Sequence, residues 1–359
     1  MKIVSGKSRL TSILVVGGMR ADSDNRVRGT FHHNPSSLRL SMADPNLQQI
    51  PRGTDSEVER YVKEMFVAPQ GSVFWARDYS GIEAKLVGYF VGSARYTRLA
   101  ALGVHAFLAS HILHRPADLS WSDADLSLYF KEIKKEKGIY DRAKRTVHAS
   151  NYMVSPNKLV IEYPEIFPTI KDAAALQGLY FDLFPEIRGW HKDLCQRVDG
   201  TKRRHLGEEP EAVDPWTLGV CHAVNPFGYT HRFYNVLDWE LVEYEGKKEW
   251  ISSYGEDAKR LISFLPQSTA AAIIKRAAKG IWYSGSRVRE TLRLLIHDEI
   301  FGESVEAEVG DALVLSKQIM EAPIPELPLD PSWGMGTHLM VGTEAKVGKS
   351  WASMKGVDD

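Results

Sequence analysis

The chain has few cysteines, no long apolar run and almost no net charge, and each shortage excludes a class of protein. Its two cysteines, Cys195 and Cys221, lie far apart and form no CxxC pair, which argues against a disulfide framework or a zinc site and fits a reducing compartment. No run of about 18 apolar residues occurs, so we expect no membrane-spanning helix. A formal net charge of −1 excludes a uniformly basic protein.

Positive charge is nevertheless concentrated in two regions. Residues 131–158 hold eight Lys or Arg against three acids, and residues 1–52 hold eight against three, whereas from Asp298 to the end twelve acids face four bases. A polyanion would be attracted to the first two regions and repelled by the last. Basic helix faces in contact with water explain the same charges equally well.

Length and composition fit a large globular protein. With 359 residues, of which 43% are hydrophobic and 25% charged, the chain can form two domains or one domain with a large insertion. Apolar periodicity predicts strands towards both ends of the chain and helices in its middle. We therefore predict an α+β body that carries a helical insertion.

The individual elements follow from periodicity and from the positions of proline and glycine. We predict a strand at 72–79, a helix at 82–90, helices over 122–152 with a break near Gly138, and two helices over 171–198 divided at Pro185. Farther along we predict a hairpin around Glu245 and Gly246, a helix at 256–285 interrupted near Pro266, a hairpin at 292–304, a helix at 305–320 and a strand near 338–347.

The N-terminal stretch resembles a secretion signal at first sight, with basic residues before the short apolar run "LTSILVV". No small-x-small cleavage site follows it, and its β-branched residues predict a strand. We therefore expect the protein in the cytoplasm.

The segment "LRLLIHDEIFGES" (292–304) places His297, Asp298 and Glu299 side by side in the middle of an apolar stretch. Burying a carboxylate without a partner costs several kcal/mol. Either the segment turns at this point and exposes its polar tip to water, or a positive partner is held by the carboxylates. The segment alone leaves both interpretations open.

A second acid follows an apolar run in "VFWARDYSG", where Asp78 stands at the end of the predicted strand. Such a residue is either a metal ligand or the N-cap of the helix that follows. Phosphoryl transfer with two divalent ions requires carboxylates that meet at one point. The sequence cannot show whether Asp78 and Asp298 meet, because 219 residues lie between them.

A third candidate is the helical stretch "YDRAKRTVHASNYMVSPNKL" (140–159). Lys144, His148 and Tyr152 recur every four residues and therefore lie along one helix face. A cation, an imidazole and a phenol in a row are suited to binding a triphosphate and stacking on a base. Alternatively, the two rings pack on the core and Lys144 extends past them to water.

Together these segments resemble family A DNA polymerases. "DYSGIEAKLVGYF" (78–90) is similar to motif A of that family, "AKRTVHASNYMVSP" (143–156) to motif B and "LLIHDEIF" (294–301) to motif C. "LRLSMADPNLQQIP" (38–51) resembles the family's TGRLSSxxPNLQNIP, and "LPQSTAAAIIK" (265–275) its QGTAAD helix. The order and spacing of all five agree, and the resemblance covers nearly the whole chain from about residue 26.

The resemblance implies a right-hand polymerase fold that lacks most of the thumb, with an antiparallel palm sheet and a helical fingers insertion. The implied domains are 1–52, a primer-template segment from a thumb remnant to the palm; 53–94, the first part of the palm; 95–198, the fingers; and 199–359, the second part of the palm.

The implied activity is template-directed addition of dNTPs to a primer 3′-hydroxyl, with two Mg²⁺ ions. Asp78, Asp298 and the main-chain carbonyl of Tyr79 would hold the ions, and Glu299 would be a supporting catalytic acid. The implied nucleotide-binding residues are Lys144 for the triphosphate, His148 for stacking, Tyr152 beside the nascent pair, Glu83 as the gate against a 2′-hydroxyl, and Arg142. The implied contacts to primer-template DNA are Arg39, Asn46, Gln48, Gln267 and His297.

The chain also departs from the family pattern. Leu38, Ala149 and Met153 stand where the family has glycine, and the last two would crowd the templating base. Tyr140 replaces an arginine for which Arg142 is a substitute. Only about 25 residues precede the resemblance, too few for a thumb. We therefore expect a palm-and-fingers unit that was either cut from a longer chain or encoded by a split gene, with a separate thumb or exonuclease polypeptide as partner in the second case. For a phage-encoded chain the expected location is the host cytoplasm.

Two other functions remain open from the sequence. The first is a catalytically impaired nucleic-acid-binding subunit, or a fragment of a split polymerase, with its fingers altered at Ala149 and Met153. The second is a polymerase that accepts an RNA template or ribonucleotides, which Glu83 disfavours.

Overall fold

A computed structural model describes residues 21–33, 37–50, 57–198, 221–244 and 247–358. The chain divides into two compact units, each described below by itself. Unit 1 comprises Met1–Ile82, Ala270–Pro328 and His338–Asp359, and unit 2 comprises Glu83–Thr269 and Leu329–Thr337. None of the helices in the described ranges has the length and apolar character that a bilayer crossing requires.

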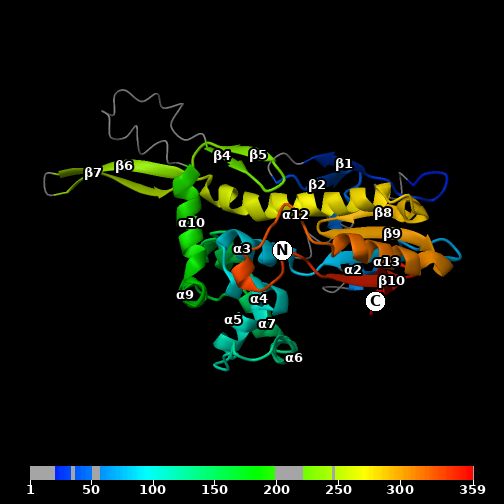
Figure 1. Ribbon diagram of the computed structural model, residues 1–359, viewed down its shortest axis with the longest axis horizontal. Helices are drawn as coiled ribbons and strands as arrows, with labels where there is room; N and C mark the ends of the chain where they lie inside the picture. Colours follow the sequence, from blue (N-terminus) through cyan, green and yellow to red (C-terminus); the bar gives the residue numbers. More distant parts are fainter. Residues whose placement is uncertain (1–20, 34–36, 51–56, 199–220, 245–246, 359) are drawn as a thin grey trace. The chain divides into compact units, whose positions relative to one another are not determined.

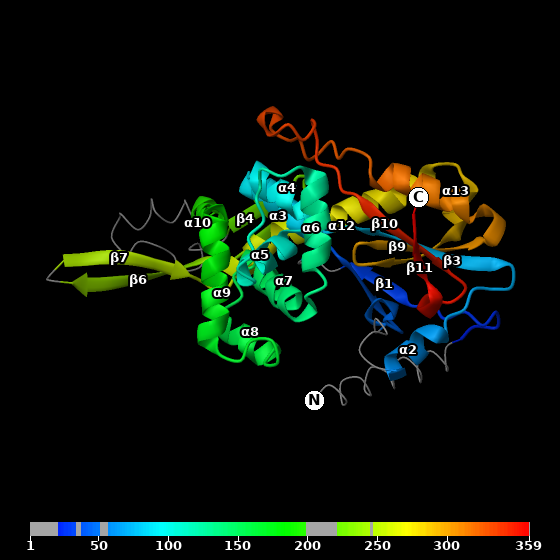
Figure 2. The same ribbon diagram turned by 90° about the horizontal axis from the view of Figure 1, so that it is seen from below.

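Unit 1 is built on a five-stranded antiparallel sheet with the order β11-β10-β3-β9-β8 (Figures 1 and 2). The strands are β3 (Ser72–Tyr79), β8 (Leu292–Ile296), β9 (Glu299–Val305), β10 (Thr343–Gly348) and β11 (Lys355–Val357). The central strand β3 is rich in aromatic and apolar residues, and Val73 to Arg77 are all buried. Both faces of the sheet are therefore covered.

The two faces of β3 carry different contacts. Phe74 and Ala76 pack in an apolar cluster with Leu294 and Phe301. Because side chains alternate along a strand, Arg77 points to the opposite face, where α13 (Val309–Met320) lies. Its guanidinium donates to Ser316 Oγ, to Thr343 Oγ1 and to the carbonyl of Leu313, each at 2.9 Å. These bonds satisfy a fully buried cation.

The N-terminal part of unit 1 packs on the first of these faces. It consists of β1 (Thr30–His33), β2 (Leu40–Ala43), the 3₁₀ turn η1 (Leu47–Gln49) and α2 (Glu57–Glu64). Met42, Leu47 and Ile50 join the cluster around Phe74.

Four more 3₁₀ turns occur in the described ranges: η3 (Arg287–Thr291), η4 (Glu306–Glu308), η5 (Pro331–Trp333) and η6 (Trp351–Ser353).

Unit 2 is mainly helical. Its helices are α3 (Ile82–Val91, whose first residue belongs to unit 1), α4 (Ala94–Leu102), α5 (Val104–Ile112), α6 (Asp123–Ile133), α7 (Lys137–Asn151), α8 (Pro156–Glu162), α9 (Ile170–Leu183) and α10 (Pro185–Val198). Ser93, Ser122, Ser155 and Thr169 precede α4, α6, α8 and α9, and each side chain accepts a hydrogen bond from the amide three residues on. Such caps satisfy free amides at a helix start. The helices enclose a core that includes Leu99, Phe107, Phe130 and Phe184.

Two hairpins and half of a long helix complete unit 2. The strands are β4 (Cys221–Val224), β5 (Thr230–Phe233), β6 (Leu237–Tyr244) and β7 (Lys247–Tyr254). The helix α12 (Ala258–Tyr283) contributes its first half to unit 2 and its second half to unit 1. Phe233, Leu261 and Phe264 pack with Trp190 and with the buried Cys195 of α10.

The predicted α+β class is confirmed, and most predicted elements are present. The strand at 72–79 and the division at Pro185 agree with the structure. The predicted interruption near Pro266 is wrong, because α12 continues through this residue. The break near Gly138 lies slightly earlier, between α6 and α7. The predicted N-terminal strand and the turn at 245–246 lie outside the described residues.

The compact units group three segments, 83–94, 199–269 and 329–337, differently from the predicted domains, which stay predictions. Residues 83–94, predicted with the palm, group with the helices of unit 2, because Val87 of α3 lies in their core. The described part of 199–269, also predicted with the palm, belongs to unit 2 as well, since β5 and the first half of α12 pack against α10.

Replacement of Gly302 by alanine should destabilise unit 1. A Cβ at this position would lie 2.2 Å from Cε2 of Trp75, whose indole is fully buried and donates through Nε1 to Thr291 Oγ1 at 3.2 Å. Overpacking of this kind costs about 1–3 kcal/mol, so we expect a lower midpoint of chemical unfolding. The control is Gly310→Ala in α13, where a Cβ meets nothing within 4 Å. Equal midpoints for the two variants would contradict this explanation.

Candidate active site

Asp78 and Asp298 lie at the same end of the sheet of unit 1. Asp78 pairs in register with Glu299 across β3 and β9. The amide of Tyr79 donates to the main-chain carbonyl of Asp298 at 3.2 Å. Asp78, Asp298 and Glu299 are all partly exposed. The structure therefore brings together the two aspartates whose meeting the sequence could not show.

The β8–β9 turn consists of His297 and Asp298, because Ile296 pairs directly with Glu299. The polar residues of this segment thus form a hairpin tip. His297 has a φ of 55°, a left-handed conformation that tight hairpins require and that glycine usually supplies. A non-glycine residue in this region costs about 1–3 kcal/mol and is typical of functional sites. His297 is exposed at the tip.

A further acid at this end of the sheet was missed by sequence reasoning. Glu344 of β10 pairs with Asp78 from the side opposite Glu299. Directly paired residues of an antiparallel ladder lie on the same face, so the three acids form a row across β10, β3 and β9. The predicted final strand contained Glu344, but its register against β3 cannot be read from the sequence.

The oxygen donors at this site suit magnesium. Carboxylates and a main-chain carbonyl are hard ligands, and Mg²⁺ usually binds one or two carboxylates together with substrate phosphates. Throughout the described part of the chain, no three His, Cys, Asp or Glu side chains form a preassembled metal site. The nearby phenol of Tyr79 stays protonated, because burial, above all, raises its pKa.

Three of the predicted DNA-contact residues meet near the hairpin. Arg39, Gln48 and His297 line one small pocket together with Leu295 and Lys275. The side-chain amide of Gln48 donates to the carbonyl of Leu295 at 2.8 Å, which ties the segment 38–50 to β8. Sequence reasoning missed Lys275, although it ends the quoted stretch 265–275. Its ammonium donates to the carbonyl of Leu38, and burial lowers its pKa.

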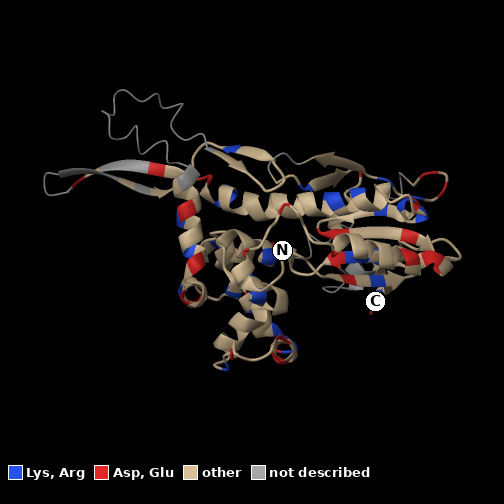
Figure 3. Ribbon diagram, in the orientation of Figure 1, with Lys and Arg blue, Asp and Glu red and all other residues tan. Residues whose placement is uncertain are grey.

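The two other predicted DNA contacts lie elsewhere. The side chain of Asn46 accepts from the amide of Gln48 at 3.1 Å and caps η1. Gln267 lies in the half of α12 that belongs to unit 2 and is partly buried. Lys and Arg recur along the second half of α12, whereas acids gather on β9 and at the start of α13 (Figure 3).

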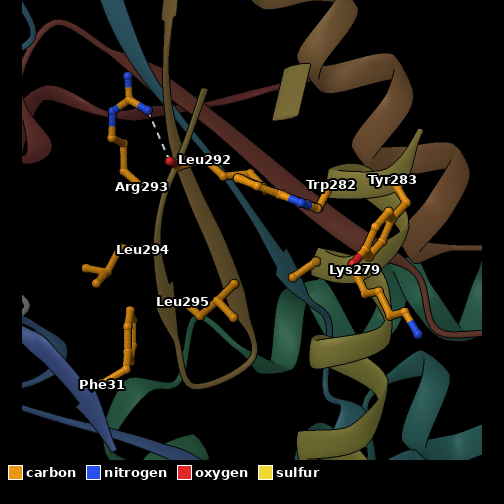
Figure 4. Close-up of a pocket in the computed structure, with 9 residues that line it drawn as sticks. Phe31, Lys279, Trp282, Tyr283, Leu292, Arg293, Leu294 and Leu295 are labelled. Carbon is orange, nitrogen blue, oxygen red and sulfur yellow. Dashed lines mark hydrogen bonds between the residues drawn. The ribbon is translucent and has the colours of Figure 1, made fainter. Parts of the chain in front are cut away.

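A larger pocket of unit 1, with a volume of about 450 Å³, lies beside the edge strand β8 (Figure 4). Trp282 and Tyr283 of α12 line it on one side and Phe31 of β1 on the other. Arg293 turns back on its own strand and donates to the carbonyl of Leu292 at 3.0 Å. Among the described residues, those that line this pocket include no carboxylate, which distinguishes it from the acidic end of the sheet.

In unit 2 the structure brings together Glu83, His148 and Tyr152. The hydroxyl of Tyr152 donates to Oε2 of Glu83 at 3.4 Å, and Nδ1 of His148 lies 3.8 Å from the same oxygen. The rings of His148 and Tyr152 pack edge to face, with their centroids 5.0 Å apart. His148 is exposed and Tyr152 is buried. The predicted helix face therefore meets the first turn of α3.

Lys144 and Arg142 lie on different sides of α7. Lys144 is exposed one turn before His148. The guanidinium of Arg142 lies over the buried ring of Phe167, 6.0 Å from its centroid. Residues two apart on a helix do not face each other, so the structure does not place Arg142 beside Lys144. Nearby, His105 has a pKa lowered to about 4, chiefly by burial and then by Lys144 and His148, so it is neutral at pH 7.

The three positions where the resemblance expects glycine differ in conformation. The backbone is left-handed at Leu38, with a φ of 58°, and at Met153, with a φ of 55°. Ala149 is helical, only 3% exposed, and packs in a cluster with Leu159 and Phe167. Its methyl group is enclosed within unit 2, and the expected crowding of a templating base stays a prediction.

Comparison with known proteins identifies the relatives of this chain. A family model described as DNA polymerase family A matches residues 6–205, more than half of the chain. The thermostable DNA polymerase I of Thermus thermophilus is 26% identical over 323 residues, which are 89% of this chain and 31% of that protein. DNA polymerase I of Deinococcus radiodurans is 25% identical over 308 residues, which are 84% of this chain and 27% of that protein. The chain thus spans about a third of the length of these relatives.

Among solved structures, the POL domain of Pol1 from M. smegmatis, in complex with DNA primer-template and dNTP, has a similar fold. The match has a TM-score of 0.64 and covers 96% of this chain and 51% of that chain, at 23% identity. At this level of identity, the similarity concerns the fold alone.

Glycine and alanine should have opposite effects at positions 149 and 153. At the left-handed position of Met153, we expect Met153→Gly to be more stable than Met153→Ala by about 1 kcal/mol, because alanine keeps the strained Cβ. At the helical position 149, we expect Ala149→Gly to be less stable than the parent by about 1 kcal/mol. Chemical unfolding of the three variants measures both differences. The same sign at both positions would refute the assigned backbone conformations.

Proposed function

The chain belongs to DNA polymerase family A, and we propose on this basis that it adds dNTPs to a primer 3′-hydroxyl under the direction of a template. One observation carries the proposal: Asp78 and Asp298, far apart in the sequence, meet at one end of the sheet. Packing alone does not explain why negative charge is concentrated there. A reaction that needs divalent cations beside a triphosphate explains it, because the carboxylates would bind those cations.

Asp78, Asp298 and the main-chain carbonyl of Tyr79 would hold two Mg²⁺ ions. When bound, the ions would supply charge stabilisation for the attacking and leaving oxygens. Glu299 pairs with Asp78 and would add negative potential that favours the ions. The role of the chain is to hold these acids on a rigid sheet, so that they need not reorganise during the reaction.

The helical unit would bind the incoming nucleotide. The exposed ammonium of Lys144 would pair with the triphosphate, and the exposed ring of His148 would stack on the base. Glu83, held by the hydroxyl of Tyr152, would lie under the sugar, where its carboxylate would collide with a 2′-hydroxyl. The proposed substrate is therefore a dNTP.

Primer-template DNA is the proposed partner. The pocket lined by Arg39, Gln48 and His297 offers donors for phosphate and base-edge oxygens, which supports a contact with the primer end. Roles for Asn46 and Gln267 in DNA binding, a separate thumb or exonuclease polypeptide, and a cytoplasmic location remain predictions.

Loss of either aspartate should abolish primer extension. Asp78→Asn and Asp298→Asn keep the shape of the side chain but remove the charge that holds a cation, so we expect the rate to fall by roughly a thousandfold or more. Single-nucleotide extension with Mg²⁺ measures the rate. Asp311→Asn, an exposed residue of α13, is the control and should extend like the parent. Undiminished extension by either active-site variant would end the proposal, and DNA binding without any extension by the parent would favour a non-catalytic subunit.

Substitution of Lys144 should weaken nucleotide binding, whereas substitution of Arg142 should weaken packing. Lys144→Gln removes an exposed cation from the proposed triphosphate site, so we expect KM for dNTP to rise about tenfold or more. Arg142→Gln removes the contact with Phe167, so we expect a lower unfolding midpoint and a nearly unchanged KM. Steady-state kinetics and chemical unfolding on both variants test this. A larger rise in KM for Arg142→Gln than for Lys144→Gln would contradict it.

A further inference from the structure

The C-terminal end of α7 is held by buried hydrogen bonds around Asn151. Its Nδ2 donates to the hydroxyl of Tyr96 at 3.0 Å, and its Oδ1 accepts from the hydroxyl of Tyr180. The two hydroxyl oxygens lie 2.9 Å apart. Tyr96 comes from α4 and Tyr180 from α9. Tyr96 and Tyr180 are 0% exposed and Asn151 is 4% exposed.

These contacts satisfy every donor of the cycle. Asn151 donates to the Tyr96 oxygen, the Tyr96 hydroxyl reaches Asn151 Oδ1 at 3.3 Å, and the Tyr180 hydroxyl can donate to the Tyr96 oxygen or to Asn151 Oδ1. Burial raises the pKa of Tyr96 to about 12, and it also raises the pKa of Tyr180 well above its usual value. Both phenols therefore keep their protons. A fully satisfied polar cycle in a buried site is rigid, because each bond broken leaves an unpaired group.

The main chain at this point is fixed as well. The carbonyl of Asn151 lies 2.9 Å from Nε2 of His191 in α10, a ring whose pKa is lowered to about 4, chiefly by burial. The carbonyl of Val154 accepts from the side-chain amide of Gln177 at 2.9 Å. Between them, Met153 has the left-handed backbone that ends the helix. Thus α4, α9 and α10 all hold the end of α7.

The next residue after Asn151 is Tyr152, whose hydroxyl reaches Glu83 at 3.4 Å. This is a long hydrogen bond, so a small displacement of the helix end would break it. We propose that Asn151 is a positioning residue that holds Tyr152 against Glu83 and thereby sets how strongly the site rejects a ribose in favour of a deoxyribose. The inference rests on the proposed function, since Glu83 must lie under the sugar.

Burying an asparagine costs free energy, because its polar atoms must be taken out of water. Leucine has a similar shape and leaves no polar atoms to satisfy. What the amide supplies is direction, because it can only be satisfied when Tyr96 and Tyr180 approach from two fixed sides. The cycle therefore favours one position of the helix end. An apolar residue would allow several.

Two variants test the proposal from opposite sides of the cycle. Asn151→Leu removes the amide from α7, and Tyr180→Phe removes one hydroxyl on α9 without changing α7. We expect each to lower the ratio of kcat/KM for dNTP to that for the matching NTP about tenfold, as expected for a misplaced contact. The control is Tyr129→Phe, which removes a hydroxyl that donates to the carbonyl of Arg115 at 2.6 Å in the same unit. Its ratio should not change.

The outcomes separate positioning from stability. A purely structural role would lower the unfolding midpoint of all three variants and leave the sugar ratio unchanged, which would overturn the proposal. If Asn151→Leu does not fold, Tyr180→Phe decides alone, and an unchanged ratio for it overturns the proposal.

A double-mutant cycle tests the same coupling without catalysis. If the parent does not extend primers, the proposed function fails, and the unfolding midpoints of Tyr180→Phe, Tyr152→Phe and the double variant decide whether the buried cycle positions Tyr152. Midpoint shifts that do not add show that the buried cycle and Tyr152 are coupled. Additive shifts show that they are independent and overturn the inference.

Discussion

The register of β3 against β9 is the constraint on which the acidic site depends. Side chains alternate between the faces of a sheet, so a slip of one residue would move every partner of β3 to the wrong face. The pairing of Trp75 with Gly302 opposes such a slip, because only glycine leaves space for the buried indole. With that pair fixed, Asp78 meets Glu299 three residues along. A packing contact in the middle of the sheet thus determines where charge is concentrated at its end.

The two units hold their candidate site residues in different ways. In unit 1, apolar packing and the strand ladder hold short acidic side chains whose backbone position is decisive. In unit 2, a long aromatic side chain must be placed, and the helix that carries it ends in a buried polar cycle. Hydrogen bonds specify direction better than apolar contacts do. Polar groups are therefore buried where the orientation of Tyr152 matters.

Local patterns predicted the elements well, and long-range pairing explains what they missed. The apolar run in 72–79 and the proline at 185 each indicate an element by themselves. Pro266 did not end α12, because tertiary packing offsets the loss of one amide. Glu344 escaped notice because its significance depends on strand register. Asn151 was missed because its hydrogen-bond partners come from two helices that are distant in the sequence.

The length of the β8–β9 turn limits how this site can evolve. Only two residues, His297 and Asp298, connect the paired strands, so the connection has no residue to spare. An inserted residue would either lengthen the loop or shift one strand, and in both cases Asp298 would leave the end of β3. This turn therefore tolerates exchanged side chains but no change in length. His297 has a left-handed backbone there because a two-residue connection between these strands requires it.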